Sequence, residues 1–264
     1  MGMSRHEQLV ASPLLSSPAQ VTAVDTLPAS SPTGTFAPSH AAGATISSGD
    51  EQVAQYAPVV VQSLRERRLH LDLALARFAE QADELATLAG LLVETLSSGH
   101  KVLVAGNGGS AAEAQHFAAE LVGRFKRERS PYPVLPLTTD TATLTAVAND
   151  YGYAEVFARQ VHAFGQCGDL LLAFSTSGES ENLVRAAQVG REHLMTVCAI
   201  TGERASRLER LSHTTVRVPH TDTPLVQELH MIITHILCDL IETQLVSLAT
   251  SLDSQLSQFD EHEQ

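Results

Sequence analysis

Short, continuously apolar runs alternate with segments of helical periodicity along most of the chain, and this alternation constrains the fold more than any other feature. Strands that are apolar throughout must be covered on both faces, which is typical of parallel sheets. The pattern therefore predicts an α/β protein with a doubly wound parallel β-sheet flanked by helices. The predicted strands are residues 102–105, 133–137, 169–174, 195–200 and 214–218.

Helical periodicity fills the intervals between these runs and also precedes the first of them. A helical N-terminal lead-in is predicted over 51–68 and 71–98, where apolar residues such as Val53, Tyr56 and Val60 recur at helical spacing. The last predicted helix is long and apolar. The other predicted helices are 110–125, 140–148, 153–164, 180–192, 204–211 and about 223–248.

The two ends of the chain differ from this folded part. In residues 1–50, Ser, Ala, Pro, Thr and Gly occupy 31 positions and only four residues are charged. Such a segment buries too little apolar surface to offset the entropy of ordering it, so we expect a disordered extension. No apolar core of a secretory signal follows Arg5, and a transit peptide would be richer in arginine. We expect a folded domain over 51–249 and an acidic, flexible tail over 250–264.

Charge and hydropathy exclude further classes of protein. The formal charge is −13, with 17 basic and 30 acidic residues, which argues against a protein that grips nucleic acid through its phosphates. No uninterrupted apolar run approaches the roughly 18 residues that span a bilayer, so no membrane partner is expected. The three cysteines, Cys167, Cys198 and Cys238, form no CxxC pair and are expected to be reduced core thiols.

A glycine-rich turn, residues 106–110, joins the first predicted strand to a helix. Its glycines let the backbone approach a ligand, and the helix N-terminus offers free N–H groups to an anion. A tight turn without a ligand would have the same composition. The turn is not GxGxxG, and no acidic residue ends the second strand, so a dinucleotide site is disfavoured.

A hydroxyl-rich turn, residues 175–180, follows the third strand along the chain. It holds Ser175, Thr176, Ser177 and Ser180, whereas one hydroxyl suffices to cap a helix. An elaborate N-cap is the alternative to an anion site. Neither turn contains lysine, which excludes a Walker-type nucleotide site and favours a small sugar phosphate held by neutral donors.

Two helices carry residues that could bind a metal ion or transfer protons. His116 and Glu120 are four residues apart, so both lie on one helical face, although a solvated pair is the commoner meaning of this spacing. His230 and His235 lie in the last helix, where a histidine is more often a core residue with a satisfied hydrogen bond. Gln227, near the start of that helix, carries no signal alone.

Four separated segments in order resemble the phosphoheptose isomerases, which are sugar-isomerase (SIS) domain proteins, over about residues 51–248. They are AGNGGSAAEAQHFAAELVGRF (105–125), LTTDTATLTAVANDYGY (137–153), GDLLLAFSTSGESENL (168–183) and QELHMIITHILCDLIE (227–242). The resemblance implies an SIS-type fold and conversion of sedoheptulose 7-phosphate to D-glycero-D-manno-heptose 7-phosphate, the first step towards nucleotide-activated heptose. It also implies a cytoplasmic homotetramer with active sites at subunit contacts.

Site residues follow from the resemblance position by position. It implies one zinc ion per subunit, bound by His116, Glu120, Gln227 and His235, and an acid–base pair of Glu120 and His235. The implied substrate contacts are Asn107, Gly108, Gly109, Ser110, Glu120, Asn149, Asp150, Ser175, Thr176, Ser177, Ser180 and Gln227. Because Gln227 and His235 are about 12 Å apart along a straight helix, they reach one ion only if both side chains lean inward, the helix starts after Gln227, or a neighbouring subunit supplies a ligand.

Three segments depart from the family pattern, two of them near the supposed phosphate, and two other functions stay open; in the third, Glu203-Arg204-Ala205 replaces the usual Gly-Gly pair. Glu179 stands where asparagine is usual, and Leu225-Val226 replaces Arg-Ile, so both changes make the supposed phosphate region more negative. The alternative functions are a non-catalytic SIS-domain protein that binds the replication initiator and a sugar-phosphate sensor. Neither needs the pair of Glu120 and His235, which this chain has.

Overall fold

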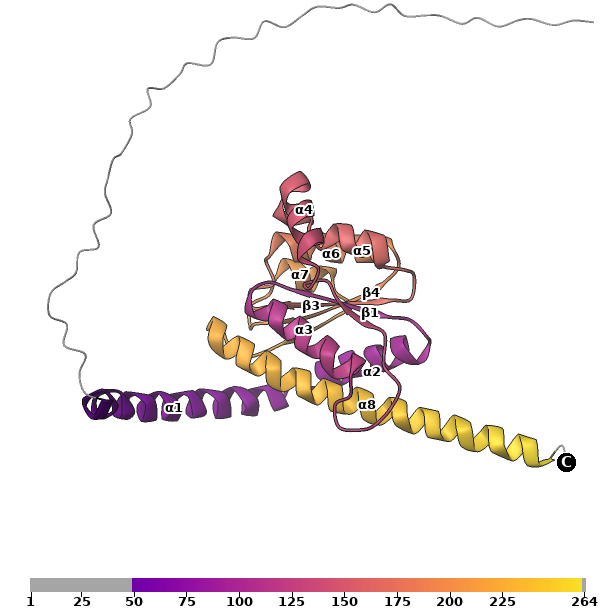
Figure 1. Ribbon diagram of the computed structural model, residues 1–264, viewed down its shortest axis with the longest axis horizontal. Coiled ribbons are helices and arrows are strands. Elements are labelled where there is room, and N and C mark those ends of the chain that lie inside the picture. Colours follow the sequence, from indigo (N-terminus) through magenta and orange to yellow (C-terminus); the bar gives the residue numbers. More distant parts are fainter. Residues whose placement is uncertain (1–48, 263–264) are drawn as a thin grey trace, which may run out of the picture. The chain divides into compact units, whose positions relative to one another are not determined.

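Five apolar runs form one parallel sheet within the described part of the chain, in the order β2-β1-β3-β4-β5 (Figure 1). The strands are β1 Val102–Gly106, β2 Val134–Pro136, β3 Leu170–Ser175, β4 Thr196–Thr201 and β5 Thr214–Arg217. The α/β class is therefore confirmed. The order reverses between β1 and β3, because the chain runs from β1 outward to β2 on one side and from β3 to β4 on the other. In open parallel sheets, this is where ligands bind.

The computed structural model describes the backbone of residues 49–262 and the side chains of residues 49–251. The expected disordered extension over 1–50 lies almost wholly outside the described residues, as do most side chains of the expected tail. The helices are α1 Gly49–Ala79, α2 Ala82–Ser97, α3 Gly109–Val122, α4 Thr141–Tyr151, the short 3₁₀ helix η1 Tyr153–Glu155, α5 Ala158–Phe164, α6 Glu181–Glu192, α7 Arg207–Leu211 and α8 Thr223–His262.

Helices cover both faces of the sheet, as the continuously apolar strands require (Figure 1). Alternate residues of a strand point to opposite faces. Leu170 and Leu172 thus pack in a cluster with α2, α3 and α8, whereas Leu171 and Ala173 pack with α5, α6 and α7. The first cluster also takes in Ala74 and Phe78 from the end of α1.

The single helix expected over 153–164 is divided into η1 and α5, and α7 begins at Arg207 and not near residue 204. Two larger differences concern α1 and α8. The break expected near residues 69–70 falls at residues 80–81, because no glycine or proline interrupts α1 there. Helix α8 continues to His262, past the expected end near 248, since no glycine or proline follows Pro224 in it. The flexibility expected for 250–264 remains a prediction.

Helix α8 corrects one expectation about apolar length. Its segment Thr223–Ser251 is long and apolar enough to cross a membrane by length and composition. However, Leu229, Ile233, Leu237 and Ile241 lie on the face that packs into the core with α2 and α3. Their burial explains the apolar composition, because the core helix of a globular domain has the same pattern.

The loop after α3 is held against α8 by a buried carboxylate. Glu242 is fully buried and accepts hydrogen bonds from the backbone N–H groups of Phe125, Lys126 and Arg127 at 2.8–3.0 Å. Arg129 Nε lies 3.3 Å from the same carboxylate. Burial raises the pKa of Glu242, but the three N–H donors and Arg129 outweigh it and leave the pKa below its ordinary value. Glu242 therefore keeps its charge while it orders this loop.

The cysteines agree with expectation at two of three positions. Cys198 and Cys238 are buried, and burial raises the pKa of each thiol to about 12, so both are inert core groups. Cys167 is exposed, so the expectation of a core thiol is wrong for it. It lies in the turn before β3, where its side chain is not needed to fill the core.

Candidate functional site

The glycine-rich turn and the hydroxyl-rich turn begin side by side at the reversal of strand order. Gly106 at the end of β1 is paired with Phe174 near the end of β3, so the two turns leave the sheet at one edge. They enclose a cavity of about 280 Å³ together with the start of α8. Its lining residues are Asn107, Gly108, Gly109, Ser110, Phe174, Ser175, Thr176, Ser180, Thr223 and Gln227.

The lining of this cavity suits an anion held by neutral groups. None of its lining residues is charged, and the N-termini of α3 and α6 meet there with their positive dipole ends. Within the described residues, the side chains of Thr176 and Ser180 make no hydrogen bond, and Ser180 precedes α6 without capping it. Their hydroxyls are therefore available to a ligand.

The other two hydroxyls of the turn serve the turn itself. Ser175 Oγ accepts a hydrogen bond from Gly178 N at 3.0 Å, and Ser177 Oγ accepts one from Glu179 N at 3.2 Å. Ser177 is exposed and does not line the cavity. Two hydroxyls of the turn, those of Ser175 and Ser177, therefore stabilise the loop. The other two, those of Thr176 and Ser180, line the cavity.

Glu179 does not bring its charge to the cavity. Its carboxylate is exposed and accepts a hydrogen bond from the backbone N–H of Arg207, the first residue of α7, at 2.8 Å. Leu225 and Val226 are buried. These departures from the family pattern therefore leave the lining of the cavity uncharged.

Two residues that the sequence analysis did not identify orient Asn107. The side-chain amides of Asn107 and Asn182 form a reciprocal pair at 2.8 and 3.0 Å, and Tyr153 Oη donates to Asn107 Oδ1 at 2.9 Å. Asn182 is buried in the first turn of α6. In the sequence, the available signal was an amide two residues after Ser180, at the start of a predicted helix. Tyr153 comes from η1, and only the tertiary structure brings it to Asn107.

Asn149 and Asp150 lie apart from this cavity. They are exposed near the end of α4, and Asn149 Nδ2 donates to Asp150 Oδ1 at 2.8 Å. Neither lines the cavity between the two turns. If they contact substrate, the exposed face of α4 must meet the site of another subunit or move towards its own.

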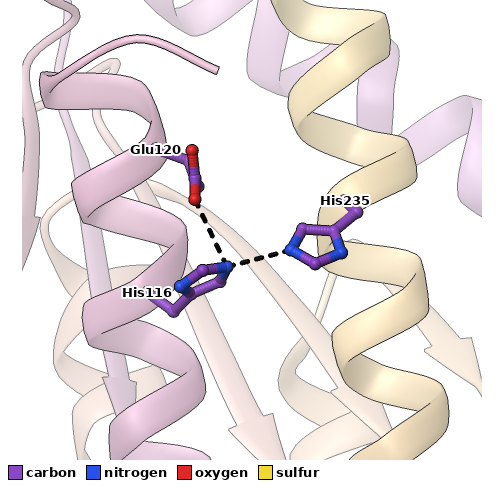
Figure 2. A group of neighbouring side chains, drawn as sticks. All are labelled: His116, Glu120 and His235. Atoms are coloured by element: carbon purple, nitrogen blue, oxygen red, sulfur yellow. Dashed lines mark hydrogen bonds and ion pairs between the residues drawn. The ribbon is translucent and has the colours of Figure 1, made fainter. Parts of the chain in front are cut away.

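His116 and Glu120 on α3 meet His235 on α8 (Figure 2). His116 Nε2 lies 2.9 Å from His235 Nε2 and 3.4 Å from Glu120 Oε1. The ligand atoms of these three residues all lie within 4.8 Å of one another, and the ring of Phe125 stacks on His235. We call them the metal trio. Two imidazoles and one carboxylate are ligands that zinc prefers, and three protein ligands leave a position for substrate.

Gln227 lies two turns before His235 on the same helix and is not gathered with the metal trio. Helix α8 begins at Thr223, so a helix start after Gln227 does not apply. The side-chain amide of Gln227 packs against Gly109, where a Cβ atom would collide with it. Gln227 therefore lies at the anion cavity, and its role as a zinc ligand remains a prediction.

A second cavity, of about 600 Å³, connects the two parts of the site. It shares Gly109 and Gln227 with the anion cavity and reaches His116 of the metal trio. The remaining lining residues are Ala112, Glu113, Pro224, Glu228 and Met231. Gly109 and Gln227 thus border both cavities, and His116 borders the second.

Comparisons with known proteins identify one family. Residues 70–202, half of the chain, match the SIS domain family. Phosphoheptose isomerase of Rhodospirillum rubrum is 46% identical over 171 residues, covering 65% of this chain and 91% of the relative. That of Helicobacter pylori strain P12 is 48% identical over 170 residues, covering 64% and 88%.

Solved structures give the same result. A phosphoheptose isomerase from Francisella tularensis superposes with a TM-score of 0.67 at 37% identity, covering 70% of this chain and 98% of that one. The enzyme from Neisseria gonorrhoeae has a TM-score of 0.65 at 35% identity, covering 70% and 99%.

Proposed function

Because the chain belongs to the phosphoheptose isomerase family of SIS-domain proteins, we propose that it converts sedoheptulose 7-phosphate to D-glycero-D-manno-heptose 7-phosphate with one zinc ion per subunit. The chain is an isomerase, and its relatives support a role on sugar phosphates in heptose biosynthesis. The finer statement, with this substrate, this product and zinc, is the proposal. The metal trio beside an anion cavity is the observation that carries it.

The two ends of the substrate have separate places in the proposed site. The phosphate lies in the anion cavity, where Thr176, Ser180 and the amides of the glycine-rich turn are its donors. The carbonyl end lies at the metal trio. The second cavity accommodates the carbon chain between them, since it borders Gly109 and Gln227 as well as His116.

Glu120 is the proposed base that moves the proton between C1 and C2. Isomerisation removes a proton from the carbon beside the carbonyl, forms an enediol and returns the proton to the neighbouring carbon, and a positioned carboxylate is suited to this step. Only Oε1 of Glu120 faces His116, and no hydrogen bond within the described residues engages Oε2. One carboxylate oxygen can therefore face the metal while the other receives the proton.

His235 is the proposed partner for the oxygen atoms. An imidazole near neutral pH can transfer the proton between O1 and O2 or assist ring opening. Bound zinc would supply a Lewis acid that stabilises the negative charge of the enediolate. His116 and Gln227 are the remaining proposed ligands.

The proposed assembly of subunits accounts for Asn149 and Asp150, which lie outside the anion cavity. We propose a cytoplasmic homotetramer whose sites lie at subunit contacts, so that the exposed Asn149 and Asp150 reach substrate across a contact. No observation favours a protein that binds the replication initiator or a sugar-phosphate sensor, because neither function requires the metal trio.

Proton NMR of the purified protein with sedoheptulose 7-phosphate in D₂O tests the proposed reaction. We expect an aldoheptose 7-phosphate with deuterium at C2, because the enediol exchanges its proton with solvent. Treatment with a chelator should stop turnover, and zinc should restore it. Zinc-loaded protein that binds the sugar phosphate without converting it would contradict the proposal and favour a sensor.

A further inference from the structure

A buried carboxylate–imidazole pair lies between α3 and α8, outside the predicted site. Glu113 Oε2 lies 3.3 Å from His230 Nδ1, and the two residues are 3% and 0% exposed. From the sequence, Glu113 has no expected role, and His230 is expected to be a core histidine with a satisfied hydrogen bond. That expectation is correct for Nδ1 only, since the buried Nε2 has no partner in the described residues.

Stability does not explain this pair. Burying a carboxylate is costly, and apolar residues of similar volume are often as stable as a buried ion pair or more so. His230 is the one hydrogen-bond partner of Glu113 within the described residues, through a single carboxylate oxygen. The other oxygen, Oε1, makes no such bond and is not enclosed in the core, because Glu113 lines the second cavity.

Glu113 lies on α3 between the residues proposed to bind the two ends of the sugar phosphate. It follows Gly109 by four residues and precedes His116 by three, which is about 6 Å and about 4.5 Å along the helix axis. Gly109 belongs to the anion cavity and His116 to the metal trio. An open-chain sugar phosphate that joins these two ends must pass Glu113, and its middle carbons carry hydroxyl groups that can donate to a carboxylate.

We propose that Glu113 binds a mid-chain hydroxyl of the open-chain sugar phosphate through Oε1, and that His230 is the positioning residue that holds its carboxylate. The inference rests on the proposed function and extends it, because it assigns recognition of the carbon chain to a residue outside the phosphate and metal contacts. The other carboxylate of the second cavity, Glu228, lies 3.5 Å from Arg67 through Oε1, so the matched control is taken outside the site, at the exposed Glu192 of α6.

Steady-state kinetics with sedoheptulose 7-phosphate test the inference. Glu113→Gln keeps the shape but removes the charge, so we expect KM to rise about tenfold, the effect of losing one charge-assisted hydrogen bond. The kcat should stay within about threefold and zinc content should not change, because Glu120 and the metal trio are intact. Inorganic phosphate, which fills only the anion cavity, should inhibit wild type and variant equally. Glu192→Gln should leave all of these values unchanged.

The role of His230 needs its own variants. His230→Leu should raise KM as Glu113→Gln does, and the double variant should be no worse than either, because both changes disable one unit. His230→Asn, which can still donate near the Nδ1 position, should recover part of the loss. A fall in kcat and thermal stability with unchanged KM would overturn the inference and make the pair structural.

Binding separates failure of the inference from failure of the proposed function. If zinc-loaded wild type turns over no sedoheptulose 7-phosphate, the proposed function is wrong, and calorimetric titration with this sugar phosphate becomes the test. Tenfold weaker binding by Glu113→Gln, with phosphate binding unchanged, would support the inference. Equal binding, or no binding by wild type, would overturn it.

Discussion

Glu120 has two proposed roles, binding zinc and transferring a proton, and the contacts of its two carboxylate oxygens are compatible with both. It is half-buried on α3, with one oxygen towards His116 and the other without a partner in the described residues. A carboxylate bound to a metal through both oxygens would be a weak base. If zinc were bound through one oxygen of Glu120, the other would remain basic enough to accept the substrate proton.

Glu120→Gln should abolish turnover while sugar-phosphate binding remains. We expect kcat to fall about 10³-fold, within the range for loss of a general base, because the amide cannot accept the C1 proton. Coupled kinetics and calorimetric binding of sedoheptulose 7-phosphate measure the two effects. The exposed Glu128→Gln is the control. Loss of binding together with turnover would mean that Glu120 is chiefly structural.

His235→Gln should reduce both zinc content and turnover. The variant removes one of two imidazoles at the metal trio, and we expect zinc affinity to fall at least tenfold, since even partners outside the ligand shell have effects of that size. Metal analysis after dialysis and kinetics with added zinc measure this. The exposed His70→Gln should retain zinc. Unchanged stoichiometry in His235→Gln would refute its assignment as a ligand.

At the scale of elements, the packing of α3 on α8 forms the site. A row of three contacts runs along the interface of the two helices. They are Gln227 with Gly109, Glu113 with His230, and His116 with His235. Glu242 extends the same interface by holding the backbone of the loop after α3. Because Phe125 of that loop stacks on His235, the anchored loop also orients a residue of the metal trio.

Glu242→Gln should destabilise the fold in a pH-dependent way. At pH 7 we expect a loss of about 3–5 kcal/mol in the free energy of unfolding, because Arg129 loses the partner of its buried charge. The pKa of Glu242 is lowered in the folded state from the ordinary value of 4.5. Its contribution is therefore present above that pH and is lost as pH falls through the lower folded pKa.

Urea unfolding at pH 7 and at several values below 4.5 measures this contribution. The difference between wild type and Glu242→Gln should narrow as the pH falls. Glu192→Gln, an exposed change on α6, should stay within about 0.5 kcal/mol of wild type at each pH. A difference that is independent of pH would mean that packing, and not charge, makes Glu242 important.

At the scale of the whole molecule, α1 exposes an apolar face that supports the proposed tetramer. Val53, Tyr56, Val60 and Leu64 lie at helical spacing and are 53–65% exposed. Exposed apolar groups arranged as a stripe favour a docking surface over a solvated one. This face agrees with the proposed tetramer and with the exposed position of Asn149 and Asp150.

Val60→Glu should dissociate the proposed tetramer into smaller species, because it places a charge within the apolar stripe. Light scattering coupled to size exclusion measures the mass, and Gln55→Glu is the matched control on the same helix. Turnover should fall with the mass if the sites depend on subunit contacts. A monomer with full activity would refute that dependence.

The sequence by itself determined the class of fold and predicted the local chemistry of the candidate site. Apolar strands covered on both faces specify a parallel sheet through burial alone, and the i, i+4 spacing of His116 and Glu120 places both on one helical face. The hydroxyl-rich turn likewise predicted an anion site. Each of these features depends only on residues close together in the sequence. Local periodicity and composition are therefore enough to predict them.

Only the tertiary structure decided which distant residues meet. Strand order brings the two turns together at the reversal between β1 and β3, and periodicity does not encode that order. The packing of α3 on α8 joins His235 to His116 and Glu113 to His230, across 119 and 117 residues of sequence. Such pairs depend on how side chains interlock between helices, and the free energy of that packing belongs to the whole core rather than to any one segment.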